Sequence, residues 1–283
     1  MSIIAGIRDM TNEEYHAQPS LSSSGARKLL PPYCPAIYKW EQEHPKFSDT
    51  FDFGHAAHKM VLGDESTKLV QIDAADWRTK AAKDAREEAR ATGAIAVLAT
   101  DYEVVTAMAV AIKAHPIASA LLRPGTGEPE KSLLWQDDDS GVWLRARLDW
   151  LPHPVKGRRL IVPDYKTCRS ANPETFARSA ADYGYHQQAA WYLDGIRALK
   201  LGEDPAFVFI AQEKVAPYLV TVIELNETAM TIGRNLNRWA INTFKQCTET
   251  NKWPGYSEGI ELVSLPAYYE KRHDEDSSLG EAA

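Results

Sequence analysis

The apolar residues in the first 122 positions of the chain follow a helical spacing. They recur three or four positions apart, as on the buried face of an amphipathic helix. After a short helix near residue 26, which Pro31 ends, we expect helices over 35–43, 51–62, 101–114 and 116–122. The segment 76–91 predicts a further helix, a polar one in which basic and acidic side chains are mixed.

Beyond residue 122 the pattern changes to the alternation of apolar and polar positions that strands require. We expect three strands over 131–136, 142–151 and 159–166, connected as a meander, with a hairpin turn at 137–141. The remaining pattern predicts helices over 173–181 and 185–199, strands over 207–212 and 218–225, and a long helix from 226 to about 250.

This order of elements predicts an α/β fold in which a mixed central β-sheet is flanked by helices. The first 122 residues would form a helical N-terminal extension of it. We expect residues 1–268 to form one domain. Residues 269–283 are polar and acidic, and we expect them to be a disordered tail.

The composition is that of an ordinary globular protein, with 44% hydrophobic and 25% charged residues. The three cysteines are widely separated and odd in number, which argues against a disulfide framework and a four-cysteine metal cluster. No segment approaches the roughly 20 apolar residues of a membrane span, and the first residues lack the pattern of a secretory signal. We expect a cytoplasmic protein with no membrane partner.

The formal net charge of −7 is unfavourable for a nucleic-acid partner, because neutralising phosphates drives such binding. Residues 251–283 account for −4 of this charge, so the rest of the chain is near neutral. Clustered carboxylates are also what a magnesium site needs. The charge therefore does not exclude a metal-dependent enzyme that acts on DNA.

Two neighbouring predicted strands carry charged residues suited to phosphodiester chemistry. Side chains alternate along a strand, so Arg145, Arg147 and Asp149 share one face. Asp164 and Lys166 also point the same way, with Cα atoms roughly 6.5–7 Å apart. The two carboxylates could hold Mg²⁺ against a phosphate, the lysine could orient or deprotonate the attacking water, and the arginines could contact the DNA backbone. For an isolated Asp-x-Lys, a surface ion pair is the simpler interpretation.

This Asp-x-Lys is one of five short motifs that occur in order along the chain. They are Gly54-x-x-x-His58, Glu130-x-Ser132, Arg147-x-Asp149, Asp164-Tyr165-Lys166-Thr167 and the segment 185–192, which reads YHQQAAWY. In this order and at these separations, the series resembles that of RecE-type exonucleases (exodeoxyribonuclease VIII). These belong to the RecB-like branch of the PD-(D/E)XK nucleases, so the resemblance implies their restriction-endonuclease-like fold.

The resemblance also implies a role for each matching residue. His58 would be a metal ligand from the N-terminal helix, Asp149 and Asp164 would be the carboxylate ligands, and Lys166 would be the catalytic lysine. On the helix that follows, one turn separates Gln188 and Tyr192; in the family, this pair supports the active site and the DNA backbone.

Other residues near the motifs leave alternatives open. Glu130 either binds a metal ion or is a solvated strand-end glutamate. Leu148 stands where the family commonly has a proline, which bears on the local strand geometry but removes no ligand. His55 matches nothing and we expect it to be structural, while Cys168 is expected to be a small core residue. The basic side chains of 78–90 either contact DNA or form a solvated helical face.

The function implied by the resemblance is a magnesium-dependent exonuclease, in which Mn²⁺ would substitute. It would degrade linear double-stranded DNA from the 5′ end and leave 3′ single strands for phage recombination. The implied partners are DNA ends, a single-strand annealing protein and further copies of the chain in a ring. The alternatives are a Cas4-like single-strand nuclease, a non-catalytic DNA-binding protein that retains the fold, and a hydrolase of small phosphoesters.

Overall fold

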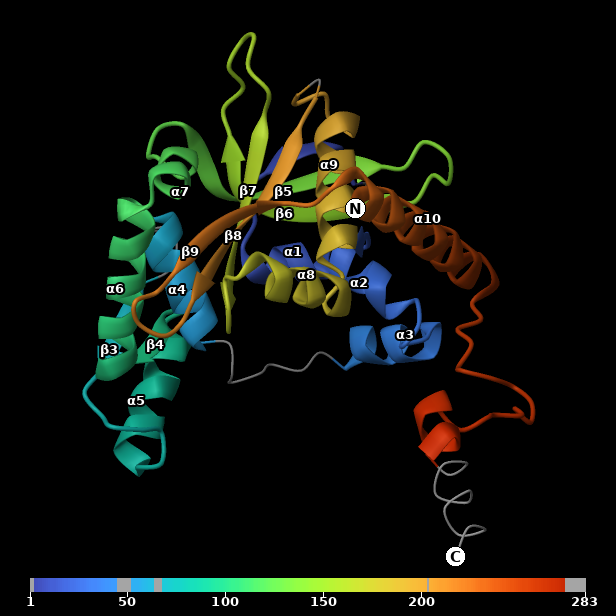
Figure 1. Cartoon of the computed structure of the whole chain (residues 1–283), viewed down its shortest axis with the longest axis horizontal. Coiled ribbons are helices and arrows are strands. Elements are labelled where there is room, and N and C mark those ends of the chain that lie inside the picture. The colour runs from blue at the N-terminus through green and yellow to red at the C-terminus, as the bar shows by residue number, and fades with distance from the viewer. Residues whose placement is uncertain (1–2, 45–51, 64–67, 203, 273–283) are drawn as a thin grey trace, which may run out of the picture.

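The computed structural model describes residues 3–44, 52–63, 68–202 and 204–272 of the chain. Strands occupy the centre, and helices cover them on several sides (Figure 1). The predicted mixed α/β architecture is confirmed.

A four-stranded sheet is built on the predicted hairpin. Strands β5 (Gly127–Gln136) and β6 (Trp143–Pro152) are antiparallel. The short strand β1 (Gly6–Arg8) pairs with β5, and β2 (Leu21–Ser22) pairs in parallel with β6. The sheet order is therefore β1-β5-β6-β2.

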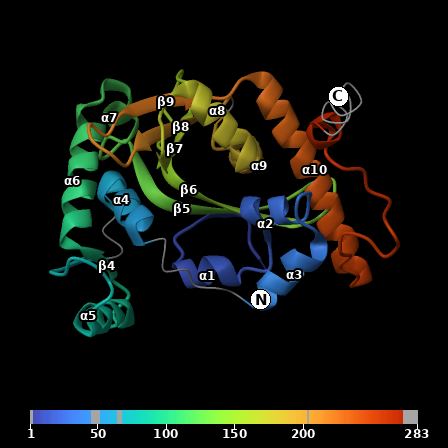
Figure 2. The ribbon, with the colours of Figure 1, turned by 60° about the horizontal axis from the view of Figure 1, so that its bottom comes forward.

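The third predicted strand belongs to a different sheet, so the predicted meander is wrong. Strand β7 (Ile161–Cys168) pairs in parallel with β8 (Ala206–Glu213), which pairs antiparallel with β9 (Val220–Glu224). The parallel pairing requires a crossover connection, and two helices supply it, α8 (Pro173–Asp182) and α9 (Tyr185–Ala198). In Figure 2, α8 and α9 lie on one face of β5 and β6 and α1 (Asn12–Ala17) lies on the other.

The N-terminal part is helical, as predicted, but also contains strands that the pattern did not indicate. Besides β1 and β2, strand β3 (Leu69–Ile72) pairs in parallel with β4 (Ile95–Leu98). At two to four residues, these strands are too short to show a clear alternation. The helices are α2 (Ser23–Lys28), α3 (Pro35–Glu43), α4 (Asp52–Leu62), α5 (Lys80–Ala91), α6 (Ala99–Ala114) and α7 (Pro116–Leu121).

Two hydrophobic clusters lie on either side of the strands that carry the candidate chemistry. Trp191 and Phe176, from the crossover helices, pack with Phe209 of β8 in the larger cluster. Met108 of α6 packs with Ile210 of β8 in the smaller one. Adjacent residues of β8 thus enter opposite clusters, because side chains alternate along a strand, and both faces of β7 and β8 are supported.

The C-terminal part begins with α10 (Glu227–Thr250), whose N-cap is Asn226 as predicted. Trp253 then stacks on Tyr38 of α3, with ring centroids 5.7 Å apart. Beyond this anchor the chain leaves the body (Figure 1), and Ile260 and Leu262 are fully exposed. Of the predicted tail, residues 269–272 belong to a helical turn over 267–272, and 273–283 lie outside the described residues.

In the part of the chain that the structure describes, no helix combines the length and the apolar character needed to cross a bilayer.

Candidate active site and metal-binding residues

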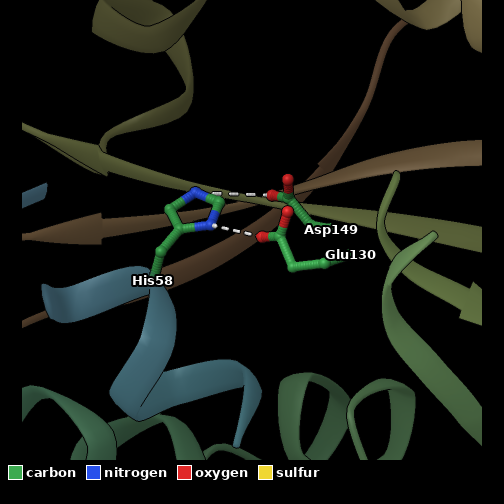
Figure 3. Close-up of side chains that lie close together, drawn as sticks. All are labelled: His58, Glu130 and Asp149. Atoms are coloured by element: carbon green, nitrogen blue, oxygen red, sulfur yellow. Dashed lines mark ion pairs between the residues drawn. The ribbon is translucent and has the colours of Figure 1, made fainter. Parts of the chain in front are cut away.

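Three side chains from distant parts of the chain meet beside β6 (Figure 3). His58 comes from α4, Glu130 from β5 and Asp149 from β6. A ligand atom from each can be chosen so that all three lie within 4.8 Å of one another. The imidazole lies between the carboxylates, with Nε2 3.5 Å from Asp149 Oδ2 and Nδ1 4.0 Å from Glu130 Oε1. We call these three residues the open triad, because their side chains remain 28%, 36% and 13% exposed.

A local distortion of β5 accompanies Glu130. The ladder pairs Pro129 with Trp150 and Lys131 with Leu148, so Glu130 stands opposite Asp149. Its φ of 53° is in the left-handed region, which is unfavourable for a residue with a side chain. Such strain persists where the surrounding structure imposes it, and it is concentrated at functional sites.

The backbone of Tyr165 connects the open triad to β7. The Tyr165 amide donates to Asp149 Oδ2 at 2.7 Å, and the Tyr165 carbonyl lies 2.9 Å from His58 Nε2. The Asp149 side chain therefore takes a hydrogen bond from a strand that β6 does not pair with. These contacts hold α4, β6 and β7 together at one point.

Asp164, Lys166 and Gln188 form a second group, which we call the buried triad. Asp164 is 1% exposed, and its Oδ1 accepts a hydrogen bond from Gln188 Nε2 at 2.7 Å. Its Oδ2 forms a close ion pair with Lys166 Nζ at 2.5 Å. The two-residue spacing on β7 thus brings the carboxylate and the ammonium together, as the sequence predicted.

Burial and the neighbouring Asp149 carboxylate raise the pKa of Asp164 to about 6, although Lys166 opposes the shift. Burial alone would lower the pKa of Lys166, but the carboxylates of Asp164 and Asp149 outweigh it, and the pKa is raised. Lys166 is therefore positively charged at neutral pH. Such a group can offset negative charge on a phosphate and is poorly suited to take a proton from water.

The helix α9 supports this group from behind. Gln188 and Tyr192 lie one turn apart on it, and Gln188 contacts Asp164 directly. Tyr192 packs edge-on against Phe207, with ring centroids 5.7 Å apart, and burial raises its pKa well above the ordinary value. Gln188 is thus placed to orient Asp164, whereas Tyr192 is placed as a packing residue of the site wall.

The two arginines predicted to contact DNA face the N-terminal segment of the chain. The buried Arg145 donates to the carbonyl oxygens of Ser20 and Gln18. Arg147 donates to the carbonyl oxygen of Met10 at 2.9 Å. Both guanidinium groups lie over the Tyr15 ring, 5.2 and 4.4 Å from its centroid. The N-terminal segment covers this face of β6 and accepts hydrogen bonds from both guanidinium groups, so both arginines hold that segment on the sheet in place of the predicted contact with DNA.

The remaining predictions about nearby residues concern His55 and Cys168. His55 is exposed on α4, outside the open triad. The Cys168 thiol donates to the Gln212 carbonyl at 3.4 Å, and burial together with Glu213 raises its pKa to about 11. It is therefore a protonated thiol at neutral pH, which agrees with the expected structural role.

Arg27 of α2 is a site residue that the sequence did not indicate. It interacts electrostatically with Tyr192, Tyr185 and Asp164, while burial lowers its pKa. Its side chain therefore adds positive charge to the wall of the site. A basic residue at the end of a short helix carries no signal for this placement, which depends on the docking of α2 against α9.

The residues present fit a divalent metal ion. An imidazole and two carboxylates converge in the open triad, and the Asp164 carboxylate lies close enough to that of Asp149 for the two charges to interact. Carboxylates suit Mg²⁺ and Mn²⁺, whereas imidazole is a more usual ligand of Zn²⁺ and Fe²⁺, so the donor set fits a divalent ion without selecting one. Asp164 lies outside the convergent group, because its two oxygens face Lys166 and Gln188.

Comparison with solved structures supports the fold. A protein from Eubacterium rectale, provisionally named an exonuclease, matches with a TM-score of 0.59 at 12% identity, over 92% of this chain and 96% of that one. A phage-related exonuclease from Haemophilus somnus 129PT matches at 12% identity over 82% of this chain and 96% of that one, but its TM-score of 0.32 carries no weight. None of the curated proteins compared with the chain matches it.

A family model gives the clearest result. The model of the PDDEXK-like domain of unknown function (DUF3799) matches residues 23–266, which include both triads and, apart from β1 and β2, the strands of all three sheets of the described residues. With most of its length matched, the chain belongs to this family of PD-(D/E)XK-like domains.

Proposed function

We propose that this protein is a metal-dependent DNA nuclease whose reaction centre combines the open and the buried triads. The observation that carries the proposal is the convergence of His58, Glu130 and Asp149 within 4.8 Å, next to the Asp164–Lys166 pair at 2.5 Å. A surface ion pair would be solvated, whereas here the carboxylate is 1% exposed and the lysine 20% exposed, and the pair adjoins a set of side chains suited to a metal ion. The PD-(D/E)XK-like family of the chain adds independent support.

The mechanism assigns a separate task to each triad. His58, Glu130 and Asp149 would hold Mg²⁺ or Mn²⁺, with Asp164 beside it; a bound ion of this kind activates water and polarises phosphate oxygens. Lys166, kept protonated by Asp164 and Asp149, orients the attacking water and offsets negative charge on the scissile phosphate. Gln188 holds the Asp164 carboxylate and, through it, the lysine.

The finer activity that we propose is an exonuclease on linear double-stranded DNA, working from the 5′ end with Mg²⁺. The motif series that resembles RecE-type enzymes supports it, as does the name of the Eubacterium rectale protein. A 3′ single strand would remain for recombination, beside a single-strand annealing protein.

Assembly of several copies into a ring is part of the same proposal. A ring would retain DNA by topology, which suits a chain whose body is near neutral. The exposed Ile260 and Leu262 support association, because apolar side chains on a segment that leaves the body gain stability when a neighbouring copy covers them. We expect a mass above that of a monomer in solution, and a lower mass for a chain shortened to residue 254. A monomeric wild type would contradict the ring.

One assay tests the activity. End-labelled linear duplex, single strands and closed circles are incubated with Mg²⁺ or EDTA, using wild type and Asp164→Ala. We expect wild type to digest only linear duplex and only with Mg²⁺, and Asp164→Ala to digest at least about 1,000-fold more slowly, which corresponds to about 4 kcal/mol of the activation barrier.

The other outcomes of this assay separate the alternatives. A preference for single strands would indicate a Cas4-like nuclease, and binding without digestion would indicate a non-catalytic DNA-binding protein. Equal digestion by wild type and Asp164→Ala would overturn the proposed reaction centre. The folded state of the variant is checked by circular dichroism, because removing Asp164 leaves Lys166 without its partner.

A further inference from the structure

A row of aromatic rings leads from Lys166 to the protein surface. Tyr185 is the first residue of α9, and its ring centroid lies 5.4 Å from Lys166 Nζ. Behind it, the rings of Phe176 and Phe209 pack at 5.6 and 5.4 Å. Both phenylalanines are fully buried, so Tyr185 rests on the rigid core of the molecule.

Tyr183 extends this row outward. Its ring lies 5.8 Å from that of Tyr185, at an interplanar angle of 35°. Unlike Tyr185, its side chain is open to solvent, and the residue is 63% exposed. A large aromatic ring therefore stands at the surface, one ring away from the proposed catalytic lysine.

Gly184 lies between the two tyrosines and forms the turn that leads from α8 into α9. Gly184 has a φ of 67°, a conformation that glycine adopts most readily. A Cβ atom at this position would meet Cδ of Arg27 at 2.4 Å, so the arginine side chain packs directly on the turn. The backbone turn next to Tyr183 thus packs against Arg27 of α2.

We propose that Tyr183 and Tyr185 form a stacking subsite for a nucleobase of the DNA strand being cut. The inference rests on the proposed nuclease function and names a part of its substrate-binding surface. Aromatic faces next to positive charges are the combination by which proteins hold single-stranded nucleic acid, because every base offers a face for stacking and every nucleotide a phosphate. Lys166 and Arg27 supply the charges here, and Tyr183 supplies the accessible face.

This subsite fits an unpaired base at the end of the strand. Tyr183 is the exposed member of the row, so the base stacks on Tyr183 while the phosphate lies toward Lys166. Tyr185 fixes the plane of the platform and separates it from the buried core. Because stacking is tolerant of base identity, the subsite positions the strand without selecting a sequence.

The test combines changes in the protein with changes in the DNA, as in a double-mutant cycle, and measures binding affinity. EDTA is present so that no strand is cut. Fluorescence anisotropy measures the Kd of short labelled duplexes with frayed ends for wild type, Tyr183→Ala, Tyr183→Phe and Trp239→Ala. The last is a matched control, because Trp239 is an exposed aromatic residue on α10. Each protein is also tested on DNA with an abasic nucleotide at one of the terminal five positions of either strand.

We expect Tyr183→Ala to weaken binding about tenfold, with Tyr183→Phe and Trp239→Ala within about twofold of wild type. At one abasic position, wild type and Tyr183→Ala should bind equally, because the base that stacks is already absent. The proposal is overturned if Tyr183→Ala binds the unmodified duplex as tightly as wild type does. It is also overturned if the ratio of the two Kd values is the same for every abasic position, or if wild type binds none of these duplexes.

The same preparations separate this inference from the nuclease proposal. Wild type is tested in parallel for cleavage of the unmodified duplex with Mg²⁺. Cleavage without any effect of Tyr183→Ala on binding would remove the stacking subsite alone. A tenfold binding effect without cleavage would leave the subsite standing and remove the nuclease.

Discussion

The open and the buried triads lie side by side but differ in how much water reaches them. In the open triad every side chain keeps contact with solvent, and the imidazole lies 3.5 and 4.0 Å from its two carboxylates. In the buried triad Asp164 is almost completely enclosed and its contacts are 2.5 and 2.7 Å long. The side chains of the first set are loosely joined to one another, and those of the second are tightly joined around the enclosed Asp164, with Lys166 still 20% exposed.

This difference indicates what each half can do. The exposed ligands are loosely joined to one another, so they can admit an ion and a phosphate while the Tyr165 backbone holds Asp149 and His58. A charge pair whose carboxylate is shielded from water interacts more strongly than a solvated pair. The Asp164–Lys166 pair is therefore organised before the substrate binds. Such pre-organisation is what electrostatic stabilisation of a transition state requires.

After the loss of Asp164 itself, removing the lysine charge of the buried triad should have the largest effect on cleavage. Lys166→Met keeps the length and apolar stem of the side chain but deletes the ammonium. We expect cleavage to fall by roughly 100- to 1,000-fold, while Mn²⁺ binding measured by calorimetry remains. Lys39→Met removes a lysine from a surface ion pair with Glu43 and should cleave normally. Loss of Mn²⁺ binding in Lys166→Met would assign this lysine to the structure of the site.

Changing the open triad should lower the affinity for the metal ion more directly than it changes the chemical step. His58→Ala removes the imidazole from between the two carboxylates, and we expect Mn²⁺ affinity to fall by roughly 10- to 100-fold. Cleavage should recover in part at high Mn²⁺ concentration, because the remaining carboxylates still bind. His55→Ala, three residues earlier on the same helix, is the matched control. Equal Mn²⁺ affinity in the two variants would exclude His58 as a ligand.

Removing the hydrogen bond from α9 to Asp164 should reduce cleavage less than the changes to Lys166 or His58. Gln188→Leu preserves the approximate volume but removes the amide that donates to Asp164 Oδ1. A buried acceptor left without its donor costs about 1–3 kcal/mol, so we expect a lower Tm and cleavage reduced about tenfold. Gln188→Glu, which adds a negative charge beside Asp164, should be worse. If Gln188→Leu cleaves as fast as wild type, the amide does not position the buried half.

The pH dependence should show the smallest effect. The pKa of Asp164 is raised from 3.8 to about 6 in the folded, metal-free protein. Because the folded value exceeds the unfolded one, the protonated carboxyl stabilises the fold below about pH 3.8, and this contribution is lost as the pH rises through about 6. Thermal unfolding in EDTA should therefore show Tm decreasing between about pH 4 and 7 relative to Asp164→Asn, which cannot ionise.

Metal should reverse this trend, since an ion binds the ionised carboxylate and stabilises the folded state that holds it. Added Mn²⁺ should raise the Tm of wild type most above about pH 6 and raise that of Asp164→Asn less. Parallel Tm curves for the two proteins, with and without Mn²⁺, would contradict the assigned environment of Asp164.

How far the sequence anticipated the site differs between its residues. Asp164 and Lys166 are two positions apart on a strand, and their meeting follows from local geometry alone. The alternation on β6 also placed Arg145, Arg147 and Asp149 on one face. It could not show that α1 and the segment around Ser20 cover the part of that face with the arginines and leave Asp149 beside His58.

The sequence by itself determined the helices, the main strands and the Asp-x-Lys pair, because their signals are periodicities and spacings within a few residues. Only the tertiary structure decided that β7 joins β8 and not β6, that Glu130 turns toward His58, and that Tyr183 stands exposed beside Lys166. These features depend on contacts between segments far apart in the chain. Such contacts are set by the packing of whole elements, which the pattern within any one element does not contain.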